Sequence, residues 1–506
     1  MAENVSSINP GTPLSENEVN RGLNVIIREG LATQAMVTLS SGIFLVAYAL
    51  QLGASNFTIG LLAAILPLSQ LIQIPAIYLV ERYRKRRLIC VTATSINRFF
   101  LVPIALIPLI LQGKVALGVL VAALTLHTSI GAISLCSWNS WMRDLIPQDR
   151  LGDFFGKRMS LATIVSVIFS LAAGFYVDYW EDSVPHRVVY AYSVMFGVAW
   201  LFGVIGTFLI ARIPEPPMNP ESSPKSFLKI ISEPLKDKNF RHLIHFLGSW
   251  NFAVNLAAPF FTVYMLKLLE LSMSYVIGLT VISQVMNVLF LRLWGRFSDR
   301  FSNKSVLAVS GPIFMLSILA WTFTTFPERH NLTMFLLVMI HIIMGITLAG
   351  VLLASANIAL KLAPKGEATA YMAAASLVNS LSAGIAPILG GQFADFFAHR
   401  QFTWDMTWRS PEGEVVFQTL NFQSWDFFFF LAFVLGLYSI HRLALVKEEG
   451  EVDESVLRHE FFAYMKRPLR NFSTAGGLRY LISHPINYFK NHRNNGVNDD
   501  HDLKND

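Results

Sequence analysis

The chain has 506 residues, of which 53% are hydrophobic and only 15% are charged, and its mean hydropathy is +0.47. Soluble domains carry about 25% charged residues, and two cysteines are too few for a disulfide-stapled secreted scaffold. The composition therefore excludes soluble, disordered and disulfide-rich proteins and indicates a polytopic membrane protein.

Apolar stretches of spanning length run along the whole chain, since a helix needs about 20 residues to cross a bilayer. They lie at 26–51, 57–80, 88–111, 114–141, 157–179, 188–211, 241–267, 272–295, 304–326, 332–360, 367–397 and 424–446. None shows the strict alternation of a barrel strand, so each is predicted to be a helix. The sequence thus predicts an all-α membrane protein with 12 transmembrane helices in two pseudo-symmetric six-helix bundles.

The polar segments divide the chain into five parts. We expect a cytoplasmic N-terminal tail (1–25) without a signal-peptide pattern, a first bundle (26–211), a cytoplasmic linker (212–240), a second bundle (241–446) and a cytoplasmic C-terminal tail (447–506). The longest outer segment, HRQFTWDMTWRSPEGEVVFQTLNFQ before the last helix, is expected to be a loop.

The basic residues give the orientation. Most of the 40 Lys and Arg fall in the tails, the linker and alternate loops, whereas the remaining loops carry only Lys114, Arg187, Lys267, Arg329, Arg400 and Arg409. Cytoplasmic loops are enriched in Lys and Arg, so both termini are predicted to be cytoplasmic. The charge of +6 is a topology signal, and we expect no nucleic-acid partner.

The two halves of the chain repeat each other. At an offset of 218, Ile59-Gly60-Leu61 falls on Ile277-Gly278-Leu279, Glu81-Arg82 on Asp299-Arg300, Arg86 on Lys304, and Ser137, Asn139 and Arg143 on Ser355, Asn357 and Lys361. At 217, Pro147 falls on Pro364 and Gly174-x-x-x-Asp178 on Gly391-x-x-x-Asp395. Both copies have the same topology, as expected for parallel repeats related by an axis along the membrane normal.

Two six-helix halves, each with a basic loop after its second helix, resemble the major facilitator superfamily. The second copy, Gly295-Arg296-Phe297-Ser298-Asp299-Arg300, followed by Lys304, matches the family loop well, whereas the first copy lacks the glycine. The resemblance implies a cytoplasmic gate that stabilises the outward-facing state. Its residues would be Asp299, Arg300 and Lys304, their twins Glu81, Arg82 and Arg86, and Asn139 and Asn357 nearby. The alternative is a solvated basic loop that only sets topology.

Charged and titratable residues within the apolar stretches form a second group of candidates. Arg98 lies near the middle of the third helix and Glu29 is the deepest carboxylate; each charge at the helix centre costs about 2.5–3.5 kcal/mol on insertion scales. We expect them to act in ion coupling or as a counter-charge to the solute, or else Arg98 to bond backbone carbonyls between helices. His127 and His341 are candidates for coupling or solute binding, or for neutral interhelical bonds.

Uncharged polar residues form the third group. Gln34, Thr38 and Ser41 share one helix face, and Asn251 and Asn255 are spaced i, i+4 beside Trp250. In the family fold the first, fourth, seventh and tenth helices line a central cavity, so the resemblance implies that these side chains bind a polar solute. The alternative is interhelical hydrogen bonding.

The function predicted from these observations is secondary active or facilitative transport of a small solute by alternating access in a monomeric, multi-pass protein of the plasma membrane. We expect no cofactor, no metal and no enzymatic activity, and the sequence lacks a phosphate-binding glycine loop. The alternative is a membrane-embedded acyltransferase that would use His341 and Asn357. The steady duplication favours the carrier, since catalysis needs one asymmetric constellation.

Overall fold

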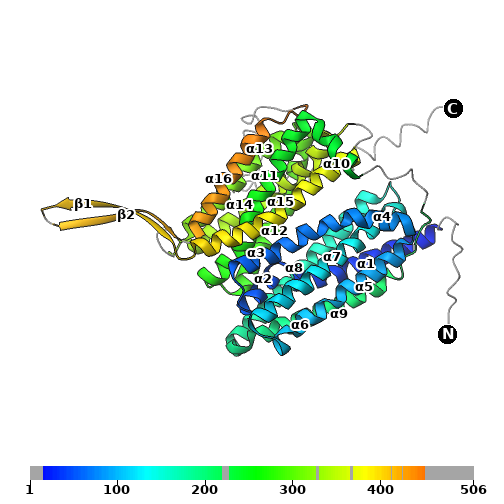
Figure 1. The fold of residues 1–506 in the computed structure, drawn as a ribbon, viewed down its shortest axis with the longest axis horizontal. Coiled ribbons are helices and arrows are strands. Elements are labelled where there is room, and N and C mark those ends of the chain that lie inside the picture. The colour runs from blue at the N-terminus through cyan, green and yellow to red at the C-terminus, as the bar shows by residue number, and fades with distance from the viewer. Residues whose placement is uncertain are drawn as a thin grey trace, which may run out of the picture.

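The computed structural model describes residues 15–218, 227–325, 330–364, 368–411, 413–423 and 425–450. Two helical bundles lie side by side with their helices roughly along one axis (Figure 1). The parts of the tails and of the linker at 1–14, 219–226 and 451–506, which the sequence predicts to be cytoplasmic, lie outside the described residues.

The first bundle contains six spans, and several of them are built from two helices. They are α1 (Glu16–Ser40) with α2 (Gly42–Gln51), α3 (Asn56–Ser69) with α4 (Gln73–Tyr83), α5 (Arg86–Phe99) with α6 (Leu101–Ile110), α7 (Gly113–Leu145), α8 (Leu151–Ser183) and α9 (Val188–Ile210). The first span breaks at Ser41, which is extended, and Gly42 follows with a φ of 58°. Helix α1 begins at Glu16, so it already starts within the predicted N-terminal tail.

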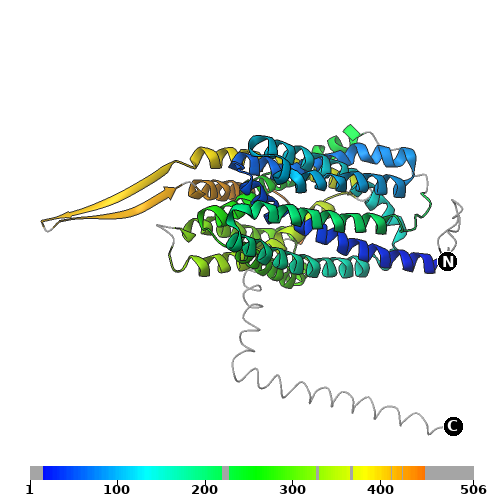
Figure 2. The same cartoon turned by 90° about the horizontal axis from the view of Figure 1, so that it is seen from below.

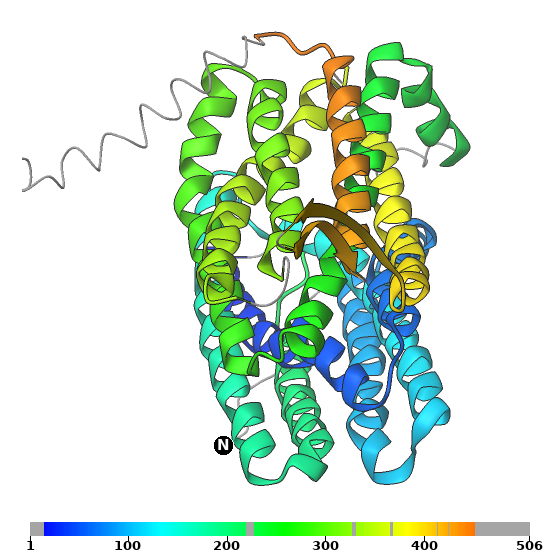
Figure 3. The ribbon, with the colours of Figure 1, turned by 90° about the vertical axis from the view of Figure 1, so that its left-hand side faces the viewer.

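The second bundle repeats this arrangement. Its helices are α11 (Lys238–Val263), α12 (Met273–Arg300), α13 (Asn303–Ala320), α14 (Thr333–Lys361), α15 (Ala368–Phe397) and α16 (Trp425–Ala444). A short helix, α10 (Phe227–Lys236), lies within the predicted linker and packs against α15. Figure 3, viewed from the side of the hairpin, shows the blue to cyan helices of the first half lying mostly below the green to orange helices of the second half.

The described residues contain 11 helices that are long and apolar enough to cross a membrane. The remaining span of the predicted 12 is α11, which occupies the position of the seventh helix. Its polar residues, among them His242, His245, Asn251 and Asn255, lower its hydropathy. The π-helical turn Tyr264–Leu268 extends it toward α12.

The segment between α15 and α16, which the sequence predicts to be a loop, is instead a β-hairpin, whereas the spans themselves are helical as predicted. Strand β1 (Gln401–Ser410) pairs antiparallel with β2 (Gly413–Gln423), and a register shift falls between Trp404 and Asp405. The hairpin projects from one end of the bundles (Figures 1 and 2). The reason is local: alternation of aromatic and polar residues in β1 and the turn residues Pro411 and Gly413 favour paired strands.

The two ends of the molecule are therefore distinguishable. We call the end that carries β1 and β2 the hairpin end. The opposite end, where α1 begins and where the basic segments 82–87 and 296–304 lie, is the basic end (Figure 1).

Candidate functional site

Helices α3 and α15, from opposite halves, lie in backbone contact at the hairpin end. A Cβ atom added to Gly60 would overlap the carbonyl oxygen of Pro387, and one added to Gly391 would lie 2.5 Å from the carbonyl oxygen of Asn56. Only glycine permits such an approach of two backbones. Gly60 and Gly391, both at repeat positions, therefore allow the two halves to pack closely at the hairpin end.

Two carboxylates hold the same end closed by reciprocal capping. Asp395 of α15 accepts hydrogen bonds from the backbone N–H groups of Asn56 (3.2 Å) and Phe57 (3.0 Å) at the start of α3. Asp178 of α8 accepts them from Met273 (2.7 Å) and Ser274 (3.0 Å) at the start of α12. Each half therefore caps a helix N-terminus of the other half, where backbone donors are free and negative charge is stabilised.

These two caps are related by the repeat. Asp178 and Asp395 are repeat partners at an offset of 217, and the residues that they cap are the first two residues of the equivalent helices α12 and α3. The sequence pattern Gly-x-x-x-Asp signalled the aspartates as a repeated pair, but their partners in the other half follow only from the fold.

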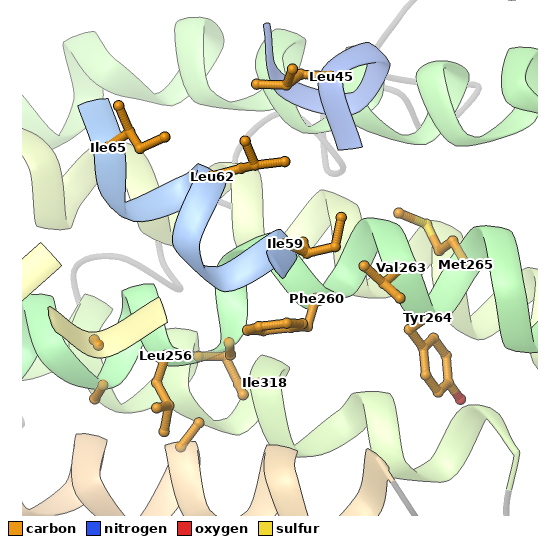
Figure 4. Close-up of a cluster of buried hydrophobic side chains, with 14 of the residues drawn as sticks. Leu45, Ile59, Leu62, Ile65, Leu256, Phe260, Val263, Tyr264, Met265 and Ile318 are labelled. Carbon is orange, nitrogen blue, oxygen red and sulfur yellow. The ribbon is translucent and has the colours of Figure 1, made fainter. Parts of the chain in front are cut away.

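An apolar seal fills the space between the caps. Figure 4 shows Ile59 and Leu62 of α3 on the same side as Leu45 of α2, with Phe260 and Val263 of α11 opposite. All five side chains are buried in one continuous cluster. The hairpin end is thus closed by backbone contact, by capping and by hydrophobic packing.

At the basic end, by contrast, the predicted gate residues contact their own half. Buried Arg86 pairs with Asp144, and its backbone N–H donates to Glu215 at 2.7 Å. In the other half, Glu448 accepts from the backbone N–H of Lys304 at 2.6 Å and pairs with Lys361 at 3.0 Å. Each of these bonds therefore stabilises one bundle rather than joining the two.

The remaining gate candidates are solvent-accessible. Arg82, Asp299, Arg300 and Asn357 are exposed, whereas Glu81 and Asn139 line a cavity of about 820 Å³ at the basic end of the first bundle. Cys136, Arg143 and Asp144 line it as well. The predicted gate side chains thus face solvent or this cavity.

The structure brings Glu29 and Arg98 together in the first bundle. An Arg98 Nη2 atom lies 3.7 Å from a Glu29 carboxylate oxygen, and both side chains are about 5% exposed or less. Arg98 also donates to the hydroxyls of Thr33 (2.7 Å) and Thr207 (2.9 Å) and to the Gly203 carbonyl. Its donors are therefore used between helices, which corresponds to the packing alternative for this arginine.

Arg158 of α8 is a third member of this cluster that the sequence did not single out. Its Nη2 lies 3.4 Å from the other Glu29 oxygen, and its guanidinium lies 5.1 Å from the ring centre of Trp138. Because Arg158 falls at the start of an apolar stretch, it was grouped with the basic residues of the preceding loop. Only the packing of α8 against α1 shows its proximity to Glu29.

Both histidines bond to backbone carbonyls. The Nδ1 atom of His127 lies 2.8 Å from the Asn97 carbonyl oxygen on α5. His341 makes the same contact with Leu337 one turn earlier, and its ring packs edge-on against Trp321 at 5.5 Å. His341 and Asn357 are 16 residues apart on α14, about 24 Å at 1.5 Å per residue, so they do not form one constellation.

The polar residues predicted to line the cavity lie in two groups. On the seam between α1 and α8, Gln34 donates to Thr38 (3.3 Å), which donates to Ser166 (3.1 Å). Ser41, at the break of the first span, donates to the Val37 carbonyl (2.7 Å). This seam is half-buried and polar along two turns.

The second group lies in the other bundle. Asn251 donates to Asn379 of α15 at 2.9 Å, and Asn255 donates to the Asn251 carbonyl at 2.8 Å. Trp250 does not join them: it is 5% exposed and its ring packs against Phe246 and Phe314. One residue of helix turns the side chain by about 100°, which directs Trp250 into the bundle and corrects its expected cavity position.

Comparisons with known proteins agree with this architecture. The family model described as Major Facilitator Superfamily matches residues 30–387 and again 277–485. No curated protein matches the chain. A point mutant of the nucleoside transporter NupG is 12% identical, with a TM-score of 0.64, and the alignment covers 84% of this chain and 100% of that one.

Two further solved structures are similar. A bacterial homologue of the iron transporter ferroportin, in an inward-facing state, is 12% identical with a TM-score of 0.61, over 85% of this chain and 99% of that one. A bacterial homologue of the human lysosomal transporter Spinster, inward-facing and unoccupied, is 16% identical with a TM-score of 0.57, over 76% and 84%. At these identities the likeness establishes the fold.

Proposed function

The chain belongs to the major facilitator superfamily of membrane transporters, and from this premise we propose that it is a secondary carrier that moves a small polar solute by alternating access. The observation that carries the proposal is the unequal closure of the two ends. At the hairpin end, Gly60, Gly391 and the caps of Asp178 and Asp395 join the halves. At the basic end, Arg86 and Glu448 bond within their own halves.

The orientation follows from the positive-inside rule, which favours a cytoplasmic location for the basic end. The structure then corresponds to an inward-facing state. Rocking of the halves would break the two caps, open the hairpin end and bring the basic loops together. In that state Asp299 and Arg300, with Glu81 and Arg82 as twins, form the latch, which is consistent with their exposure here.

The solute site lies between the halves at mid-depth in this proposal. Gln34 and Thr38 offer an amide and a hydroxyl from the first bundle, and Asn251 and Asn255 offer two amides from the second. Buried amides discriminate strongly between solutes, because a mismatched solute leaves a donor or acceptor unpaired. Glu29, a buried carboxylate between two arginines, is the group proposed for ion coupling.

Uptake into proteoliposomes tests the carrier function. The purified full chain is reconstituted, and a panel of labelled polar metabolites is offered with and without a proton gradient. We expect saturable accumulation or counterflow of at least one solute, and faster uptake with the gradient if Glu29 couples transport. Chemical conversion of a solute without accumulation would contradict the proposal and favour an enzyme.

A further inference from the structure

The cluster around Glu29 carries more positive than negative charge. Arg98 and Arg158 share the single carboxylate of Glu29, with N–O distances of 3.7 Å and 3.4 Å. The side chain of Glu29 is 4% exposed, so little water reaches this carboxylate. Two guanidinium groups thus share one carboxylate in a largely buried position, where a further anion would be stabilised.

The two arginines differ in how their donors are used. Arg98 donates to two hydroxyls and one carbonyl in addition to its ion pair. Arg158 has one long hydrogen bond to Glu29, and among the described residues its Nε is buried without a hydrogen-bond partner. Arg158 is also 22% exposed, against 5% for Arg98. Arg158 is therefore the more accessible of the two guanidinium groups and the one with fewer hydrogen bonds, while its unpartnered Nε faces Gly30 of α1.

The surroundings of Arg158 fix its guanidinium in place. The group lies over the ring of Trp138 from α7, a favourable cation–π contact. On the side of α1, a Cβ atom at Gly30 would lie 2.6 Å from the Arg158 Nε, so glycine at this position makes room for the arginine. A guanidinium that is held in one plane is suited to two parallel hydrogen bonds with a carboxylate or phosphate.

A polar row continues from this point toward the hairpin end. Both the Glu29–Arg158 pair and the Thr38–Ser166 hydrogen bond join α1 to α8, and Gln34 lies between them along α1. The row offers an amide and two hydroxyls to the uncharged part of a solute. A positively charged group at one end of the row and neutral polar groups along the rest are suited to binding a polar anion.

We propose that Arg158 binds the oxyanion of the solute, a carboxylate or a phosphate, on the α1–α8 seam. The assignment rests on the proposed carrier function and specifies its substrate class as anionic. Arg98 has a different role, because it holds Glu29 and the α1, α5 and α9 helices together.

Thermal unfolding of the full-length protein in detergent tests this assignment without requiring transport. The probes are inorganic phosphate, acetate and the short-chain lipid dihexanoyl phosphatidylglycerol, with glycerol as an uncharged control at constant ionic strength. The variants are Arg158→Gln and Arg158→Lys. Lys157→Gln is the matched control, since it removes one positive charge from an exposed neighbour on the same helix. Glu29 keeps Arg98 as its partner in every variant.

We expect phosphate or acetate to raise the unfolding temperature saturably in the wild type and in Lys157→Gln. In Arg158→Gln the apparent Kd should weaken about tenfold or more, the factor lost with one charge-assisted hydrogen bond, and Arg158→Lys should fall between. Equal stabilisation in Arg158→Gln, no stabilisation of the wild type by either anion, or stabilisation by the lipid alone would overturn the assignment. Absence of solute uptake with Arg158-dependent anion binding intact would instead contradict only the carrier function.

Discussion

The reciprocal caps at the hairpin end give the most quantitative prediction. In Asp178→Asn and Asp395→Asn, one carboxylate oxygen becomes an amide that faces a backbone N–H, and the negative charge at a helix N-terminus is lost. A charge at this position is worth about 0.3–1 kcal/mol when exposed and up to about 2 kcal/mol when partly buried. Both caps exist only while the hairpin end is closed, so the substitutions shift the protein toward the state that is open there.

The environment of each aspartate sets the size of its effect. Asp178 is half-buried and its shorter bond is 2.7 Å, whereas Asp395 is exposed and its bonds are 3.0 and 3.2 Å. We therefore assign about 1 kcal/mol to Asp178 and about 0.5 kcal/mol to Asp395. A free-energy change of 1.4 kcal/mol corresponds to a tenfold change in an equilibrium ratio. The ratio of open to closed protein should therefore rise about fivefold in Asp178→Asn and about twofold in Asp395→Asn. In the double variant it should rise about tenfold, because the effects of distant sites are additive.

Pulsed EPR distances across the hairpin end measure this ratio. Spin labels are placed at Gln51→Cys and Lys267→Cys, two exposed positions in opposite halves, with Cys90 and Cys136 replaced by serine. Asp182→Asn is the control, because it removes the same charge from an exposed position one turn away. Identical distance distributions in the wild type and in the double variant would refute the capping argument.

Three further substitutions test other parts of the account. Gly60→Val should prevent closure of the hairpin end and lengthen the distance between the same labels, whereas Gly278→Val, its repeat partner with open space around the Cβ position, should not. Asp299→Asn should slow solute uptake severalfold with unchanged membrane insertion. The control Asp153→Asn, which changes another exposed acid, should transport like the wild type. Equal uptake rates in the two variants would contradict the role of Asp299 as a latch. Asn251→Ala should raise the half-saturating solute concentration more than Asn379→Ala does. If the two variants changed uptake and stability equally, Asn251 would have only a packing role.

The helical architecture was predictable because each span is an apolar stretch of fixed minimum length and because the chain repeats itself. The β-hairpin was not predicted, because it lies outside the apolar stretches in a segment whose polar and turn residues are typical of a loop. The alternation of apolar residues at Phe402, Trp404 and Met406 is the signal that indicates a strand there. Helix α11 was predicted from the apolar stretch 241–267, even though its polar residues keep it outside the 11 spans selected by hydropathy.

The candidate site was predictable only residue by residue. Depth within an apolar stretch identified Glu29 and Arg98, but their ion pair depends on the packing of both α1 and α5 against α9. Arg158 was counted with the basic loop because it is only the second residue of the apolar stretch 157–179, and hydropathy does not show which neighbouring helix a side chain contacts. Trp250 is adjacent to Asn251 in the sequence but is buried against Phe246 and Phe314, and sequence spacing alone does not distinguish the two environments.

The central claim is that the two halves move as rigid units, so that one end opens only when the other closes. The most direct test combines the hairpin-end labels with a second pair at the exposed residues Lys85 and Arg296 of the basic end, in the wild type and in Gly60→Val. If the halves move as rigid units, Gly60→Val lengthens the hairpin-end distance and shortens the basic-end distance. A basic-end distance that stays the same, or that lengthens together with the other, would contradict it.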